Sequence, residues 1–141
     1  MKKQTINQKI EIHASAEKVW QVMWNNDSYK KWAAAFMPGS HYVGDLKPGG
    51  RIQFLDPSNN GMESDVESVT KNQEVTFRHL FELEAGNAGK TLGDMREKFE
   101  LVEKDDVTTL FVSSDMPEEY FEEMNTATTS ALQIIKEMSE Q

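Results

Sequence analysis

Between residues 41 and 114, apolar and polar residues alternate in one short segment after another. This period of two is typical of a β-strand with one buried and one exposed face. The segments cover residues 41–43, 51–55, 62–69, 74–82, 96–103 and 107–114. Turn-forming residues separate them, and such short connections join antiparallel strands, because parallel strands need a long crossover. The sequence therefore predicts an antiparallel sheet built from successive hairpins.

The residues before this region predict one more strand and two short helices. Residues 4–13 alternate as a strand, and Ser15 follows as a candidate helix cap whose hydroxyl can accept from a free amide of the first turn. The first short helix begins after Ser15, and the polar stretch Asn25–Asp27 ends it. A second short helix is expected after it, carrying Trp32 and Phe36.

The last segment changes to a period of three and four. Its inward positions are Phe121, Met124, Thr128, Ala131, Ile135 and Met138. This spacing predicts one amphipathic helix of about twenty residues, with Asp115 as its cap and Pro117 in its first turn. One strand, two short helices, about six strands and a long helix make an α+β fold, in which the terminal helix covers one face of the sheet. The length of 141 residues fits a single domain over residues 1–141.

Composition removes several classes of function. The chain has no cysteine, which excludes disulfides, thiolate zinc sites and thiol nucleophiles. Its formal net charge of −9 disfavours binding to nucleic acid. The basic N-terminus lacks the apolar stretch of a secretory signal, and no window is apolar enough to span a membrane. We therefore expect a cytoplasmic protein that neither inserts into membranes nor binds nucleic acid.

The sequence from Gly86 to Thr91 ends like a phosphate-binding loop. That motif needs a glycine five residues before Gly89, and it needs a helix after the threonine, so that backbone amides meet the phosphates. This chain has Glu84 at the first position and an alternating segment after Thr91. We therefore interpret residues 86–93 as a loop that does not bind phosphate.

One histidine stands out among possible polar site residues. The three histidines lie in separate predicted elements without metal-site spacing, and the acidic clusters lack the spacing of a calcium loop, so we predict no metal and no cofactor. Alternation places His79 on the apolar face of segment 74–82, together with Val75, Phe77 and Phe81. A neutral imidazole there can orient a polar ligand group or act as a base, and it can equally be a core residue bonded to a neighbour.

Four short motifs carry a family resemblance. They are Ile12–Trp20 at the change from strand to helix, Trp32 in the second short helix, the Pro-Gly-Gly turn within Asp45–Arg51, and Thr109-Leu110 in the last strand. With the order of elements, they resemble the START-like superfamily (SRPBCC, Bet v I), and within it the AHSA-type group, named for the activator of heat-shock-protein ATPase. The resemblance implies a helix-grip fold, in which a curved antiparallel sheet of about seven strands wraps around the long C-terminal helix.

The resemblance also implies a cavity between the sheet and the terminal helix. The residues expected to line it are Trp32, Phe36, Phe54, His79, Phe99, Tyr120, Phe121, Met124 and Thr128. His79 and Tyr120 would be its polar handles, and the larger apolar side chains would be its walls. A core filled by these same side chains is the alternative. The resemblance implies no shared catalytic residues.

Three functions follow as hypotheses. The leading one is a small-molecule binding module whose cavity takes a hydrophobic or amphipathic ligand. The alternative is a protein-interaction module related to the chaperone-ATPase activators, and the third is a cavity enzyme, a cyclase or hydrolase, that uses His79 or a buried carboxylate. The sequence contains no nucleophile motif, so it favours binding over catalysis. A monomer and a homodimer both stay open.

Overall fold

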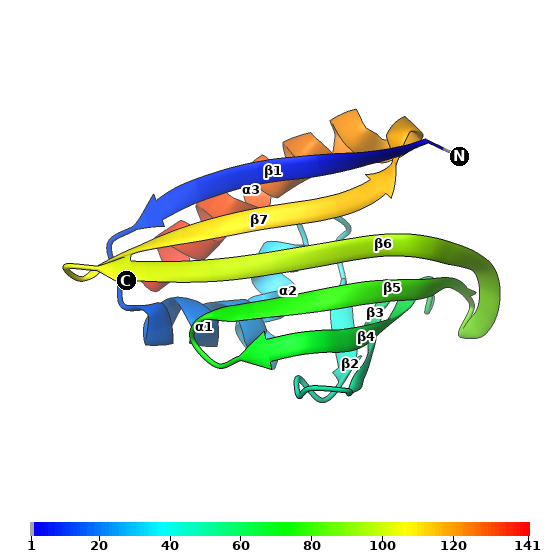
Figure 1. Ribbon diagram of the computed structural model, residues 1–141, viewed down its shortest axis with the longest axis horizontal. Coiled ribbons are helices and arrows are strands. Elements are labelled where there is room, and N and C mark those ends of the chain that lie inside the picture. Colours follow the sequence, from blue (N-terminus) through cyan, green and yellow to red (C-terminus); the bar gives the residue numbers. More distant parts are fainter. Residues whose placement is uncertain (1) are drawn as a thin grey trace.

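A curved antiparallel sheet of seven strands forms the body of the protein, as the computed structural model of residues 2–141 shows (Figure 1). The strands are β1 (Lys3–Ile12), β2 (His41–Gly44), β3 (Arg51–Leu55), β4 (Gly61–Thr70), β5 (Glu74–Glu84), β6 (Asn87–Lys104) and β7 (Val107–Pro117). Their order across the sheet is β1-β7-β6-β5-β4-β3-β2, so only β1 leaves its place in the chain order, to pair with β7. The predicted sheet of successive hairpins is confirmed.

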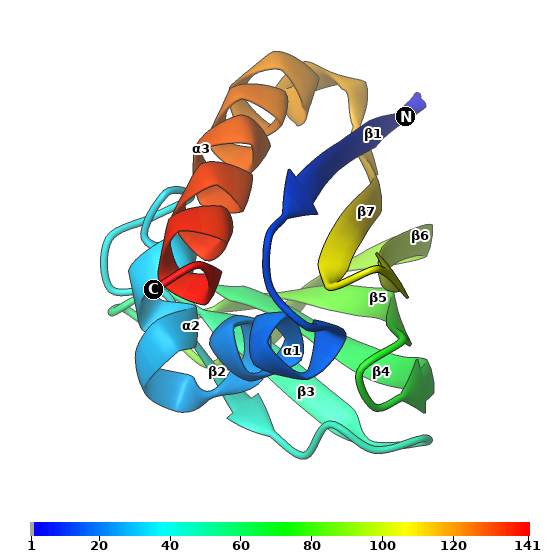
Figure 2. The same ribbon diagram turned by 90° about the vertical axis from the view of Figure 1, so that its left-hand side faces the viewer.

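The helices lie on the concave side of this sheet. They are α1 (Ala16–Trp24), α2 (Asn26–Ala33), the short 3-10 helix η1 (Glu118–Tyr120) and α3 (Phe121–Ser139). Figure 2 shows α3 along one side of the concave face and the α1–α2 pair across one end of it. This arrangement is the helix-grip fold. No helix within residues 2–141 is both long and apolar enough to cross a bilayer.

Local hydrogen bonds explain where the two short helices begin. The Ser15 hydroxyl accepts from the backbone amide of Lys18 at 3.1 Å, which confirms it as the cap of α1. The Asn25 side chain does the same for α2, accepting from the amide of Asp27 at 3.1 Å. Because Asn25 also ends α1, the two helices are joined by a single residue, and α2 ends at Ala33, before Phe36.

Trp24 is the centre of the core. Its ring is 7% exposed, and its centroid lies 5.5 Å from that of Phe99 and 5.6 Å from that of Phe77. Four further aromatic rings surround it, those of Trp20, Tyr29, Trp32 and Tyr42. The Tyr42 hydroxyl also donates to the Trp24 carbonyl, which ties β2 to the end of α1. This cluster therefore joins both short helices to the middle of the sheet.

Hydrogen bonds fix the position of α3 along the edge strand β1. The Gln8 side-chain amide donates to the backbone and side-chain oxygens of Asn125, each at 2.9 Å, and Lys136 Nζ donates to the Glu11 carbonyl at 3.0 Å. Later residues of α3 thus meet later residues of β1. The Glu118 amide, just before α3, donates to the Lys2 carbonyl. The first turns of α3 therefore lie beside the first half of β1 (Figure 2).

The segment interpreted as the loop 86–93 is instead part of a hairpin. β5 continues to Glu84 and β6 begins at Asn87, with a two-residue turn of Ala85 and Gly86, both at positive φ. Such a turn suits the right-handed twist of paired strands. The interpretation failed because most side chains of residues 84–91 are exposed, so this stretch lacks the alternation that marks a half-buried strand.

Two further expectations were wrong. Asp115 is not a helix cap and Pro117 is not in a first turn: both lie within β7, and α3 begins only at Phe121. The Asp115 carboxylate accepts from Thr5 Oγ1 at 2.6 Å and from the Arg96 amide at 3.0 Å. Phe81 does not share a face with His79. A β-bulge between them shifts the register, so Phe81 pairs with Glu63, whereas His79 pairs with the next residue, Ser64.

Replacing Trp24 by alanine should destabilise the protein strongly. We expect Trp24→Ala to lower the free energy of unfolding by about 3–5 kcal/mol, because it leaves a large cavity among buried rings. Phe111→Ala is the matched control, since this ring is 38% exposed on the convex face and its loss should cost about 1 kcal/mol or less. Urea denaturation followed by circular dichroism measures both values. Equal losses in the two variants would contradict the central role of Trp24.

Candidate functional site

A row of polar side chains crosses the concave face of the sheet. Strand register places Ser64 on β4 opposite His79 on β5, and Glu97 on β6 opposite Ser114 on β7. Ser64 and His79 are themselves buried on the inner face. Glu97 pairs with the fully buried Phe77, so Glu97 and its partner Ser114 lie on the same face. Four polar residues side by side inside a sheet are unusual, since buried polar groups are costly unless they are paired.

Three members of this row form a chain of contacts, with His79 in the middle. Ser64 Oγ lies 2.7 Å from His79 Nδ1, and His79 Nε2 lies 3.6 Å from Glu97 Oε1. Ser64 is 0% exposed and His79 is 4% exposed, whereas the Glu97 side chain keeps 25% of its surface accessible. The carboxyl group is therefore the end of the chain of contacts that a ligand can reach.

Burial sets the charges of these groups. It lowers the pKa of His79 from its ordinary 6.5 to about 4, with the charge of Asp115 acting weakly in the other direction. Burial also raises the pKa of Glu97 from its ordinary 4.5 to about 7. The pKa of Tyr29, in α2, is raised by burial and then by the charges of Glu97 and Tyr42. At pH 7 the imidazole is neutral and the Glu97 carboxyl is close to half ionised.

A neutral imidazole carries one proton, and its contacts decide on which nitrogen. When Glu97 is ionised, the Ser64 hydroxyl donates to Nδ1 and the Nε2 proton faces the carboxylate. Both hydrogens then point along the chain toward Glu97. His79 thus directs a neutral donor toward the carboxylate, at a distance of 3.6 Å that is longer than a hydrogen bond, and Ser64 contacts only His79.

The inner stripe of α3 is fully packed over only part of its length. Thr128, Ala131 and Ile135 are at most 6% exposed, whereas Phe121 and Met124, at the same helical spacing, are half-buried. The Glu97–Ser114 pair continues across β7 to Ile6, in the first half of β1, which is where the first turns of α3 lie. The partly accessible carboxyl and the partly packed end of the helix are therefore at the same level of the fold. We call these three partly exposed residues, Glu97, Phe121 and Met124, the α3 recess.

Some of the predicted site residues belong to the packed core. Trp32 and Phe99 are 5% and 6% exposed, their ring centroids lie 6.4 Å apart, and Trp32 Nε1 donates to the Met23 carbonyl at 3.0 Å. Phe36 and Phe54 are half-buried at the edge of this core. Trp32 and Phe99 are therefore core residues, and Phe36 and Phe54 pack against that core.

The other predicted residues divide between the recess and the surface. His79 lies in the polar row, with its ring centroid 6.4 Å from that of Phe54. Phe121 and Met124 lie on the half-buried part of α3, and Thr128 is buried with its hydroxyl donating to the Met124 carbonyl at 2.7 Å. Tyr120 is 50% exposed in η1, which does not place it as an interior polar handle.

Sequence reasoning missed Glu97 and Ser64 as site residues. The signal for Glu97 was present, because it precedes Phe99 by two residues in an alternating segment and so shares its face. Ser64 stands between two acidic residues, Glu63 and Asp65, and nothing in that stretch marks it. Its pairing with His79 depends on the register of β4 against β5, which no local pattern reveals.

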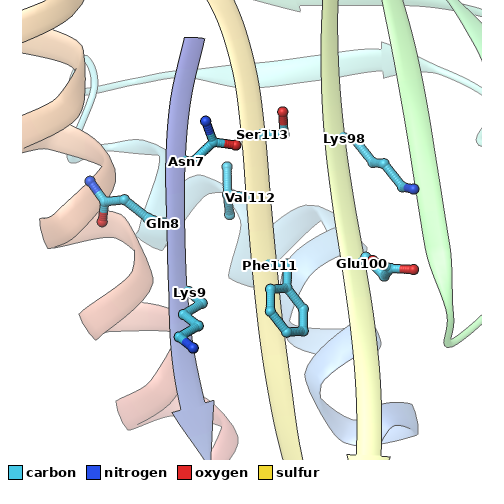
Figure 3. Close-up of a pocket in the computed structure, with 8 residues that line it drawn as sticks. All are labelled: Asn7, Gln8, Lys9, Lys98, Glu100, Phe111, Val112 and Ser113. Atoms are coloured by element: carbon cyan, nitrogen blue, oxygen red, sulfur yellow. The ribbon is translucent and has the colours of Figure 1, made fainter.

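Two surface grooves lie away from the polar row and from the predicted site residues. One of about 320 Å³ is on the convex face over β1, β7 and β6, where Lys9, Lys98 and Phe111 point outward (Figure 3). The other, of about 490 Å³, follows the seam between β1 and α3. None of the nine predicted site residues lines either groove. Within residues 2–141, no three His, Asp or Glu side chains come together as a metal site.

A seven-stranded sheet that grips a terminal helix defines the class of helix-grip proteins. Residues 13–140 match the family described as Activator of Hsp90 ATPase homolog 1-like protein, and because this match covers most of the chain, the protein belongs to that family. The family resemblance seen in the sequence is thereby confirmed. Among curated proteins, no sequence relative is found.

Solved structures show the same fold at low sequence identity. The Aha1 dimer from Colwellia psychrerythraea has a TM-score of 0.74 and 22% identity over 97% of this chain and 96% of that one. CalU16 from Micromonospora echinospora has a TM-score of 0.70 and 18% identity over 97% of this chain and 76% of that one. DynU16, from the dynemicin biosynthetic locus, has a TM-score of 0.70 and 13% identity over 94% and 46%.

The two shifted pKa values should have opposite effects on stability. Between pH 4 and 6.5 the unfolded chain binds more protons at His79 than the folded one, so this residue makes stability rise with pH, by at most about 3 kcal/mol. Between pH 4.5 and 7 the folded chain binds more protons at Glu97, so this residue makes stability fall with pH, by a similar or smaller amount. In the native protein the two effects partly cancel.

Replacing either His79 or Glu97 should expose the pH dependence of stability that the remaining residue causes. We expect Glu97→Gln to steepen the rise of unfolding free energy from pH 4.5 to 6.5, and His79→Gln to flatten or reverse it. Urea denaturation at pH 4.5, 5.5 and 6.5 measures the slopes, and Glu100→Gln controls for the loss of a carboxylate from the opposite face. Identical slopes in the two inner-face variants would show that the assigned shifts are wrong.

Proposed function

We propose that the protein binds a small hydrophobic or amphipathic molecule in the α3 recess. The observation that carries this proposal is the 25% accessibility of Glu97 on an inner sheet face where the neighbouring Ile6, Phe77 and Phe99 are buried. A carboxyl that faced only protein atoms would be expected to have a permanent partner. Phe121 and Met124 would be apolar walls of the site, and His79 with Glu97 its polar groups.

The composition of this region suits such a ligand. Apolar sites with few, well-placed polar groups are typical of small-molecule pockets, and methionine adapts to ligands of different shape. The cytoplasmic location and the single-domain organisation expected from the sequence are part of the same proposal.

The polar row gives less support to a hydrolase. Ser64, His79 and Glu97 have the composition of a nucleophile–base–acid triad, but Ser64 is 0% exposed. A nucleophile must reach the reacting atom of its substrate. The accessible member of the row is the carboxyl group, so the row supports binding, or proton transfer by Glu97, better than attack by the serine hydroxyl.

A second candidate function is interaction with a chaperone, as the family description suggests. The observation in its favour is a small apolar area on the convex face, where Phe111 and Val102 are 38% and 51% exposed on neighbouring strands. If a chaperone contacts this area, Phe111→Glu should abolish its retention on the immobilised protein. Met124→Glu, inside the recess, is the control and should not affect it. Lack of retention by the unmodified protein would remove this function.

Binding in the recess can be tested with the neutral fluorescent probe N-phenyl-1-naphthylamine. We expect saturable binding at one site, with the stoichiometry confirmed by native mass spectrometry. Met124→Glu should weaken it at least tenfold, because a charge at a half-buried wall opposes an apolar ligand. Phe111→Glu makes the same change beside the convex groove and should leave binding intact. The reverse result would move the site to the convex face and contradict the proposal.

A further inference from the structure

Among residues 2–141, Glu97 has no permanent cation as a partner. Within the described part of the chain, residues 2–141, its one ionic contact is the His79 imidazole at 3.6 Å. Its two basic neighbours in β6 face the other side of the sheet. Arg96 pairs there with Glu67 at 2.9 Å and with Asp94, and Lys98 lines the convex groove (Figure 3).

His79 does not supply the missing charge. Its ring is neutral at pH 7, because burial holds its pKa at about 4. Tyr29 is the other titratable group that senses Glu97, and its raised pKa keeps it neutral too. The inner stripe of α3 adds only Phe121, Met124 and the hydroxyl of Thr128. Among the residues that the structure describes, the groups around the carboxylate therefore include donors but no cation.

The surroundings of Glu97 make an added positive charge effective. The directly paired residue on β5 is Phe77, 0% exposed, and Phe99 two residues along β6 is 6% exposed. Burial of these two neighbours limits screening by water on that side, so attraction to a cation is stronger than it would be at the surface. A counter-charge would also offset the cost of keeping the carboxylate ionised there.

We propose that Glu97 is the anionic subsite for the protonated amine of an amphipathic ligand, with the apolar body of that ligand against Phe121 and Met124. This inference rests on the proposed function, since it assumes that the α3 recess is the binding site. Ser64 is a positioning residue in it. By donating to Nδ1, its hydroxyl keeps the Nε2 proton of His79 directed at the carboxylate, which leaves the outer carboxylate oxygen for the ligand.

Three probes of one shape and different charge test the proposal. They are 1-naphthylmethylamine, 1-naphthalenemethanol and 1-naphthoate, titrated into the full chain at pH 7.5 by calorimetry. We expect the amine to bind at least tenfold more tightly than the alcohol, and the carboxylate to bind most weakly. Equal affinity for amine and alcohol would overturn the amine subsite while leaving the proposed function standing. No binding of any probe would overturn both.

Variants separate recognition by Glu97 from the general negative charge of the protein. Glu97→Gln should bring the affinity ratio of amine to alcohol close to one, and Glu97→Asp, which keeps the charge, should retain part of the preference. Ser64→Ala should lower the ratio without abolishing it, since it frees the His79 tautomer. Glu100→Gln removes the same charge from the opposite face and should leave the ratio unchanged.

Circular dichroism confirms that each variant is folded. A preference for the amine that survives Glu97→Gln, or one that Glu100→Gln lowers equally, would overturn the proposal.

Discussion

Burial of the concave sheet face is the constraint on which the rest of the structure depends. Seven strands curve around it, and three short-to-medium helices must cover it. The helices bury the sheet face completely at one end, where Trp24 at the end of α1 packs against Phe77 and Phe99. The second half of α3 adds the buried Ile135. Burial is incomplete at the first turns of α3. The fold thus concentrates its packing at one end and leaves the other end less completely covered.

The polar row is placed at the boundary between these two ends. If stability were its only role, an apolar core of the same volume would serve as well, because buried polar groups seldom repay their desolvation. Ser64 and His79 satisfy each other, which keeps their cost low. Glu97 is not satisfied in this way. A departure from the rules of core composition at one place in an otherwise consistent fold is typical of a functional site.

Periodicity in the sequence predicted most of the fold. The strand expected over 51–55 has these same bounds, and the spacing of apolar residues identified α3 because its stripe is buried along one side. The failures have tertiary causes. Phe81 changed face because a bulge inserts a residue that no pattern marks, and Asp115 found partners on β1 and β6 in place of a helix terminus. Residues 87–91 form a strand through pairing alone, without burying a face.

The candidate site was predictable only in part, for a geometric reason. Alternation assigns each residue to a face, so Glu97 could be assigned to the inner face with Phe99. Which part of that face stays accessible depends on how α3 is placed along β1, and hydrogen bonds between Gln8 and Asn125, 117 residues apart, determine this. No local pattern contains that information.

The same geometry explains why Glu97 is isolated in charge. In the sequence it stands between Arg96 and Lys98, which suggests a neutralised surface carboxylate. In a strand, neighbouring side chains point to opposite faces, so both cations lie outside and the carboxyl lies inside alone. Both cations therefore lie on the exposed face, where Arg96 is ion-paired with Glu67, and the half-buried carboxyl between them lies on the inner face with no cation beside it among residues 2–141. The unpaired charge is the part of the molecule that a cationic ligand would complete.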